Sequence, residues 1–170
     1  MLEKINLYMQ LMRIDKPIGF YLLMWPVLWS FLIASNGNPN LFYMLIFGIG
    51  IIVTRSAGCI INDYFDQDFD KKVERTKNRV LATKQVSNPE ALILFGLLIS
   101  ICFILLLMLG LKIILFAGFS LFLLVLYPLT KRYFKMPQLI LGLAFGSSIP
   151  MVFILEKDMI DTNCILLYII

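Results

Sequence analysis

The sequence predicts an all-α membrane protein, a polytopic bundle of transmembrane helices that forms one domain. Hydrophobic residues make up 60% of the 170-residue chain, and the mean hydropathy is +0.87. These residues gather in long runs, and a helix needs about 20 predominantly apolar residues to cross a bilayer. The cations cluster in alternate connections between the runs, as they do in proteins that span a membrane several times.

Five apolar runs are long enough to span a membrane, at 18–35, 41–61, 91–110, 113–129 and 137–155. A sixth run begins at Cys164 and extends only to Ile170, so it predicts a stub rather than a complete span. Pro26 and Pro150 lie inside predicted spans, which helices packed together in a membrane tolerate.

The segments between the runs carry their own signals. Residues 2–14 mix apolar and charged positions and predict a helix lying at the membrane surface. Residues 36–39 read Asn-Gly-Asn-Pro and predict a short turn. Ser87, followed three residues later by Glu90, predicts the N-cap of the third span. The small residues at 146–148 predict close packing between spans.

The charges predict how the chain sits in the membrane. Twelve cations precede the first span or follow the second and fourth, whereas the connections after the first, third and fifth spans carry only Lys112 and Lys157. Because cytoplasmic loops are enriched in Lys and Arg, we expect the N-terminus, the segment 62–90 and the loop 131–136 to be cytoplasmic, in a bacterial inner membrane. The predicted surroundings are a lipid bilayer with no nucleic-acid partner. The oligomeric state is left open.

Several classes of site are excluded by composition. The chain has no histidine, which removes His-dependent triads and His-ligated zinc. Its three cysteines, Cys59, Cys102 and Cys164, are far apart and lie in apolar runs, where thiols pack as small hydrophobic groups. Any metal site is therefore expected to use oxygen ligands, which favours Mg²⁺ or Ca²⁺.

An acidic row at the end of the second span is the strongest candidate for such a site. Asn62, Asp66 and Asp70 follow one another at intervals of four residues. On a helix these intervals place the three side chains on one face, with Arg55 inside the same arc of roughly 80°. Asp63 falls on the shoulder of this arc and is a weaker candidate.

A basic run follows the acidic row directly and suits a polyanion. Its cations are Lys71, Lys72, Arg75, Lys77, Arg79 and Lys84. Together the two features predict a divalent metal and a diphosphate held beside the lipid. One alternative is a solvated acidic helix end. An EF-hand is excluded, because Lys71 and Lys77 stand where that loop needs Gly and Glu. Asp68 is expected to point away from the row.

Other cations allow two interpretations each. Arg55 lies in an apolar stretch, where a charge is costly, so it either pairs with a carboxylate or binds an anionic group of a substrate. Lys131 and Arg132, which follow Tyr127, either clamp phosphate oxygens or simply mark a cytoplasmic loop. Arg13 has the same two interpretations.

Residues 62–70 and 73–79 resemble the first aspartate-rich motif of the UbiA-type intramembrane aromatic prenyltransferases. The match is closest to the branch that acts on 4-hydroxybenzoate in ubiquinone biosynthesis. Residues 11–19, 127–133 and 137–150 agree with the same branch.

The resemblance implies a nine-span bundle that transfers a polyprenyl group from a polyprenyl diphosphate to 4-hydroxybenzoate, with Mg²⁺ as cofactor. The catalytic residues expected on this basis are Asp66, Asp70 and Arg55. The expected metal ligands are Asn62, Asp66 and Asp70. The expected diphosphate contacts are Arg13, Asn62, Tyr127, Lys131 and Arg79.

The chain departs from the family pattern in two places. Val80 stands where the family usually has Pro, a position expected to shape the loop rather than the chemistry. The second aspartate-rich motif of the family is not found after Asp70, so this chain is expected to be the N-terminal part of a longer enzyme. The alternatives are a prenyltransferase for another aromatic acceptor of the menaquinone or haem pathways, an inactive fragment, and a non-enzymatic membrane component.

Overall fold

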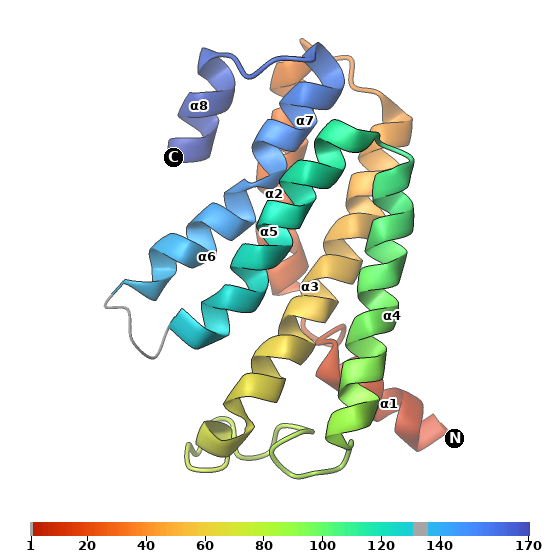
Figure 1. Ribbon diagram of the computed structural model, residues 1–170, viewed down its shortest axis with the longest axis vertical. Helices are drawn as coiled ribbons and strands as arrows, with labels where there is room; N and C mark the ends of the chain where they lie inside the picture. Colours follow the sequence, from red (N-terminus) through yellow and green to blue (C-terminus); the bar gives the residue numbers. More distant parts are fainter. Residues whose placement is uncertain (1, 131–135) are drawn as a thin grey trace.

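The predicted all-α class is confirmed. The computed structural model describes residues 2–130 and 136–170, and within these ranges every regular element is a helix (Figure 1). The helices are α1 (Leu2–Leu11), α2 (Ile18–Ala34), α3 (Leu41–Asp70), α4 (Asn88–Leu107), α5 (Leu111–Thr130), α6 (Pro137–Gly146), α7 (Ser148–Lys157) and α8 (Thr162–Ile169).

All five predicted spans are helical. Among the described residues, three helices are long and apolar enough to cross a membrane, namely Leu41–Asp70, Asn88–Leu107 and Gln138–Lys157. The apolar helices Ile18–Ala34 and Leu111–Tyr127 are shorter. At 1.5 Å per residue, the 17 residues of α2 extend about 25 Å, near the lower limit for a membrane span.

The fifth predicted span is confirmed as an apolar helical segment from Gln138 to Lys157. A local break in the regular helix at Ser147 separates α6 from α7, although Ser147 keeps helical backbone angles, with φ at −59° and ψ at −20°. The Ser147 hydroxyl donates a hydrogen bond to the Ala144 carbonyl at 2.7 Å, and Ser120 on α5 donates to Ser147 Oγ at 2.7 Å. Hydroxyl groups that bond backbone carbonyls in this way often bend helices.

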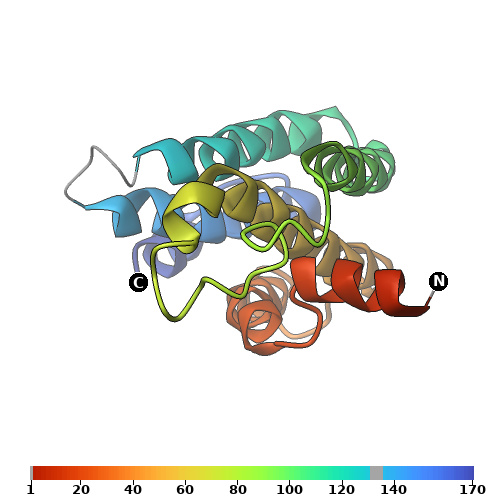
Figure 2. The ribbon, with the colours of Figure 1, turned by 90° about the horizontal axis from the view of Figure 1, so that it is seen from below.

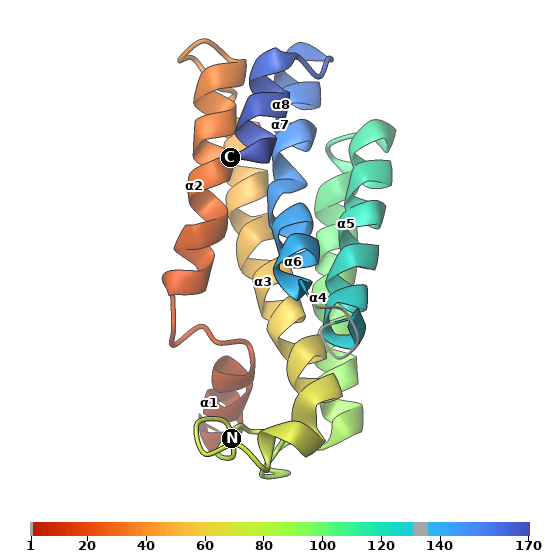
Figure 3. The ribbon, with the colours of Figure 1, turned by 90° about the vertical axis from the view of Figure 1, so that its left-hand side faces the viewer.

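α3 is the centre of the bundle and packs against α2, α4 and α5 (Figures 1 and 3). An apolar core joins α2, α3, α5 and α7, and its buried members are Val27, Phe31, Phe47, Ile113, Met151 and Val152. Phe31 and Phe47 meet edge to face, with ring centroids 5.4 Å apart. With 30 residues, α3 is about 45 Å long, which exceeds the roughly 30 Å hydrocarbon core of a bilayer.

The connections alternate between the two ends of the bundle. The turn at Asn36 and Gly37 has positive φ angles of 53° and 87°, as its Asn-Gly sequence favours. At the opposite end lie α1 and the loop from 71 to 87, which Figure 2 shows between the ends of α3 and α4. The predicted loop segment 62–90 is therefore partly helical, since residues 62–70 belong to α3 and 88–90 to α4.

The 71–87 loop is fixed by its own apolar residues. A core cluster joins it to α1, α3 and α4, and the buried members are Leu11, Ile60, Val80, Leu81, Val86 and Ala91. Val80 thus packs in the interior of the loop, in agreement with a role in its shape. The predicted cap of α4 is confirmed, since Ser87 and Glu90 form a reciprocal capping box.

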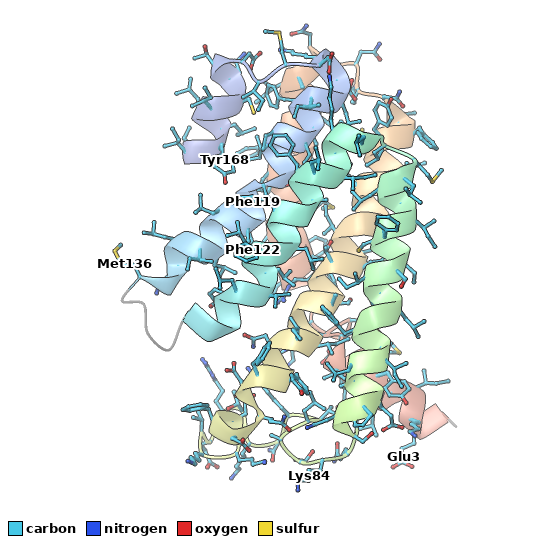
Figure 4. The ribbon with its side chains drawn as sticks, viewed as in Figure 1. Glu3, Lys84, Phe119, Phe122, Met136 and Tyr168 are labelled. Carbon is cyan, nitrogen blue, oxygen red and sulfur yellow. The ribbon has the colours of Figure 1, made fainter. Side chains whose placement is uncertain are left out.

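The outer surface of the bundle is rich in apolar and aromatic side chains. Trp25 and Trp29 on α2 are exposed, as are Phe119 and Phe122 on α5 (Figure 4). Such side chains suit contact with lipid. Inside the bundle, a Cβ atom on Gly146 would lie 2.9 Å from the Tyr168 ring, so this small residue allows α8 to pack closely.

Candidate functional site

The last two turns of α3 carry the acidic row at the end of the bundle that also holds α1 and the 71–87 loop. Asp66 and Asp70 are each 7% exposed, and Asn62 is partly buried. Asp68 lies on the solvent side, with its side chain 83% exposed and a 2.9 Å ion pair to Lys71. The helical geometry predicted this difference. The Thr76 hydroxyl donates to the Asp70 carbonyl at 3.2 Å and satisfies one of the free carbonyl groups at the helix end.

Two arginines from separate segments meet α3 at Asp63. Arg13 Nη2 donates to both carboxylate oxygens of Asp63, at 3.0 and 3.2 Å. Arg79 Nη1 donates to Asp63 Oδ1 at 3.0 Å and to Asp70 Oδ2 at 2.8 Å. Asp63 itself is only 3% exposed. The cluster joins α3 to the α1–α2 connection and to the 71–87 loop.

Asp63 was predicted only as a weaker metal-ligand candidate, and its contacts with two arginines were not predicted. The signal that points to it is its spacing of seven residues from Asp70, which places the two carboxylates about 20° apart around the helix axis. A single guanidinium group that approaches this flank of α3 therefore contacts both.

Arg13 is held in an unusual backbone conformation, with φ at +55°. Left-handed conformations are uncommon for residues other than glycine, so surrounding contacts must support this one. Burial acts to lower the pKa of Arg13, but the charge and hydrogen bonds of Asp63 outweigh burial, and the pKa lies above its ordinary value. The guanidinium group is therefore always charged.

Arg55 lies deeper along α3 and faces α2. Its Nη1 atom donates to Cys59 Sγ at 2.7 Å, so the side chain bends toward the acidic row. A Cβ atom on Gly19 would lie 2.5 Å from Arg55 Nε, which means that only glycine leaves room for the guanidinium group. Among the described residues, no carboxylate lies within ion-pair distance of Arg55. Of its two predicted roles, pairing with a carboxylate is thus not what the structure shows.

Tyr127 lies on the part of α5 that runs beside the acidic row. α3 and α5 approach closely at Gly58, where an added Cβ atom would lie 3.2 Å from Leu124. Both helices run toward the same end of the bundle (Figure 1). Asn62 and Tyr127 each follow this contact by about one helical turn. The predicted diphosphate contact Lys131 lies outside the described residues.

The donor set of the acidic row fits Mg²⁺. Asn62, Asp66 and Asp70 offer amide and carboxylate oxygens, the ligand type that this cation prefers. Within residues 2–130 and 136–170, no group of three His, Cys, Asp or Glu side chains is gathered as a metal cluster. The row supplies only two carboxylates, so water or phosphate oxygens would have to complete an octahedral shell.

Sequence comparison identifies the family. The sequence model of the UbiA prenyltransferase family matches residues 23–170. The chain belongs to the UbiA prenyltransferase family. Its apolar helices and this membership make it an integral membrane protein. The resemblance recognised in the aspartate-rich motif is confirmed at the level of the family.

Curated relatives extend beyond this chain. It is 52% identical over 151 residues to the 4-hydroxybenzoate octaprenyltransferase of Azoarcus sp., an alignment that covers 89% of this chain and 53% of the relative. It is 46% identical over 162 residues to the 4-hydroxybenzoate octaprenyltransferase of Pseudoalteromonas translucida, with 95% and 56% covered. The chain therefore spans about half the length of the curated relatives it matches.

Two solved structures share the fold. A structure of digeranylgeranylglyceryl phosphate synthase superposes with a TM-score of 0.82 at 22% identity, covering 98% of this chain and 57% of the other. A UbiA homologue from Aeropyrum pernix superposes with a TM-score of 0.73 at 23% identity, covering 88% and 55%. At this level of identity the likeness shows the helical architecture alone.

Proposed function

We propose that the protein transfers a polyprenyl group from a polyprenyl diphosphate to 4-hydroxybenzoate, in ubiquinone biosynthesis. The observation that carries the proposal is a buried acidic row that adjoins two arginines at the end of an apolar 30-residue helix. The names of the curated relatives support the choice of donor and acceptor. A scaffold or transporter half gives no reason for this combination of charges.

Asn62, Asp66 and Asp70 would hold Mg²⁺, which when bound neutralises charge on the departing diphosphate. Arg13 and Arg79 are proposed to donate charge-assisted hydrogen bonds to the phosphate oxygens. Arg79 contacts both of its carboxylates through Nη1 alone, which leaves Nη2 and Nε for an anion.

Two residues of α5 are proposed to complete the diphosphate site. Tyr127 lies about one turn beyond the contact between Gly58 and Leu124, on the side of α3 that carries Asn62. Lys131 follows Tyr127 by four residues and is assigned by resemblance alone.

The proposed reaction forms one carbon–carbon bond. The bond between the first prenyl carbon and the diphosphate oxygen breaks, and its electron pair leaves with the diphosphate. The ring carbon ortho to the phenol hydroxyl supplies the electron pair of the new bond and then loses its proton, for which the released diphosphate is the acceptor that the reaction supplies. The apolar helices around the site keep out water, which would otherwise trap the allylic cation.

Arg55 is proposed to bind an anionic group of a substrate, and the carboxylate of the acceptor is the candidate. Arg55 precedes Asn62 by seven residues, so its Cα lies about 10 Å deeper along α3. The contact with Cys59 turns the guanidinium group back toward the row. An acceptor whose carboxylate meets Arg55 would therefore place its ring between this residue and the acidic row.

The end of the bundle that holds the acidic row is proposed to face the cytoplasm from a bacterial inner membrane. α1, the α1–α2 connection and the 71–87 loop, which carry cations, lie at this end (Figure 2). An excess of Lys and Arg marks the cytoplasmic side of membrane proteins.

The acceptor can be tested directly. Membranes from cells that express the complete gene are supplied with a polyprenyl diphosphate, Mg²⁺ and a panel of aromatic acceptors, and prenylated products are measured by mass spectrometry. We expect 4-hydroxybenzoate to be prenylated in preference to menaquinone and haem precursors. Prenylation of another acceptor alone would overturn the substrate assignment, and no transfer to any acceptor would overturn the enzymatic function.

Gly19→Ala tests the role of Arg55 without changing Arg55 itself. The new Cβ atom would force the guanidinium group to move, and the end of a flexible side chain moves at little cost in stability. We expect the KM for the acceptor to rise by about tenfold or more, because the acceptor would lose one hydrogen bond from a charged donor. Gly50→Ala is the matched control, since no atom lies within 4 Å of its added Cβ. An unchanged KM would argue against the role of Arg55.

A further inference from the structure

Asp63 is the residue on which three separate segments converge. It is almost fully buried on α3, and both of its carboxylate oxygens accept hydrogen bonds from guanidinium groups. Arg13 comes from the connection between α1 and α2, and Arg79 from the 71–87 loop. Asp63 stands outside the row formed by Asn62, Asp66 and Asp70.

The position of Arg79 follows from its two carboxylate partners. Asp63 and Asp70 are seven residues apart, which is about two helical turns. Since Arg79 Nη1 lies 3.0 Å from Asp63 and 2.8 Å from Asp70, the guanidinium group lies along α3 at the level of Asp66. It is thus beside the middle of the acidic row, and its side chain is 23% exposed.

The contacts of Asp63 are those of a carboxylate that holds cations. Oδ1 accepts from both arginines at 3.0 Å, and Oδ2 accepts from Arg13 at 3.2 Å. Because both oxygens of Asp63 accept from arginine, a metal at this residue would have to displace a buried charged hydrogen bond, which is costly. At Asp70, the arginine contact among the described residues is to Oδ2.

We propose that Asp63 is a positioning residue for the diphosphate site. It holds Arg13 and Arg79 beside the acidic row, and through them it fixes the α1–α2 connection and the 71–87 loop against α3. The inference rests on the proposed function, because it assigns the two arginines to the diphosphate. It adds that Arg13 and Arg79 share one carboxylate partner, Asp63, which touches neither substrate nor metal.

The physical advantage is preorganisation. Arginine side chains have many rotamers, so fixing one of them costs conformational entropy. If a buried partner already holds the arginine in place, this entropy is lost on folding and does not weaken substrate binding. The apolar cluster that contains Val80 and Leu81 fixes the backbone of the loop close to Arg79. Asp63 then determines where the guanidinium group of Arg79 lies.

Asp63→Asn removes the charge and keeps the size of the side chain. We expect the KM for the prenyl diphosphate to rise by roughly ten- to a hundredfold, as when a charged hydrogen-bond partner is lost, with a smaller fall in kcat. The Mg²⁺ concentration that gives half-maximal activity should stay unchanged. A shift in this concentration would identify Asp63 as a metal ligand and overturn the proposal.

Limited proteolysis supplies a second readout that does not depend on activity. The 71–87 loop contains six Lys and Arg residues at which trypsin can cut. We expect faster cleavage of this loop in Asp63→Asn than in the wild type, and protection by inorganic pyrophosphate with Mg²⁺ in the wild type only. Cleavage at the wild-type rate, or full protection of the variant by pyrophosphate, would overturn the positioning role.

Two further variants keep the result interpretable. Asp68→Asn is the matched control, because Asp68 lies on the same helix end but is exposed, and its ion pair among the described residues is with Lys71. It should match the wild type in KM and in cleavage.

If Asp63→Asn does not fold, Asp63→Glu retains the carboxylate and is expected to give an intermediate KM and cleavage rate. If the wild type transfers no prenyl group, the proposed function fails, while the proteolysis arms still decide the role of Asp63.

Discussion

Asp66→Ala is expected to lower kcat/KM for prenyl transfer by about 100- to 1,000-fold, the range seen when one group that stabilises transition-state charge is removed. Asp66 is buried in the middle of the acidic row, between the levels of Asp63 and Asp70. Because two carboxylates serve the proposed metal site, the loss of one removes half of its negative charge. The measurement is product formation in membranes that contain equal amounts of inserted protein.

The matched control for this variant is Asp68→Ala. Asp68 lies two residues further along α3, but its side chain is 83% exposed and pairs with Lys71. Exposed ion pairs contribute little to stability, so this variant should retain activity close to that of the wild type. Equal losses in both variants would show that the effect comes from general negative charge at the helix end. Full activity in Asp66→Ala would contradict the proposed site.

Removal of divalent cations is expected to reduce prenyl transfer by more than about 100-fold, because charge on the leaving diphosphate would no longer be neutralised. Excess EDTA should abolish turnover, and added Mg²⁺ should restore it. The chain has no histidine, and its cysteines are far apart in the sequence, so the oxygen donors of α3 are the candidate ligands.

Combining the Asp66→Ala substitution with a Mg²⁺ titration is more informative than either experiment alone. If Asp66 helps to hold the metal, Asp66→Ala should require a higher Mg²⁺ concentration for its residual activity than the wild type requires. Asp68→Ala should titrate like the wild type. Undiminished turnover in excess chelator would contradict the metal assignment even if Asp66→Ala were inactive.

Much of the fold was predictable because its signals are local. The length of the apolar runs gave the helices, and the turn at Asn36 and Gly37 and the cap formed by Ser87 and Glu90 depend on neighbouring residues only. The local break of α6 and α7 at Ser147 was not among the predictions. It is accompanied by a hydrogen bond from Ser120, which is 27 residues away and which no local pattern reveals.

The candidate site was predictable only in part. Helical spacing separates Asp66 and Asp70, which are buried, from Asp68, which is exposed. Helical spacing places Asp63 close to Asp70, but it does not reveal the partner Arg13, which lies 50 residues earlier in the chain. A helical wheel gives the direction of a side chain but not what approaches from that direction.

The surroundings of Arg55 were likewise beyond local patterns. Its position in an apolar stretch showed that it needs a polar neighbour. That this neighbour is the thiol of Cys59, and that Gly19 on α2 makes the space, are consequences of how two helices pack. Gly19 is needed because a larger side chain would clash with Arg55, and the residues next to Gly19 in the sequence do not reveal this.

The length of α3 determines how the two substrates of the proposed reaction would meet. About 15 Å of this helix is left over once it has crossed the lipid tails, and residues 62–70 occupy about 12 Å of its length. A donor anchored by its hydrocarbon chain reaches this zone only by lateral diffusion within one leaflet, so its effective concentration is a surface density. The small acceptor arrives from bulk water. Dilution of the bilayer with inert lipid would therefore slow the encounter of the enzyme with the donor but not with the acceptor.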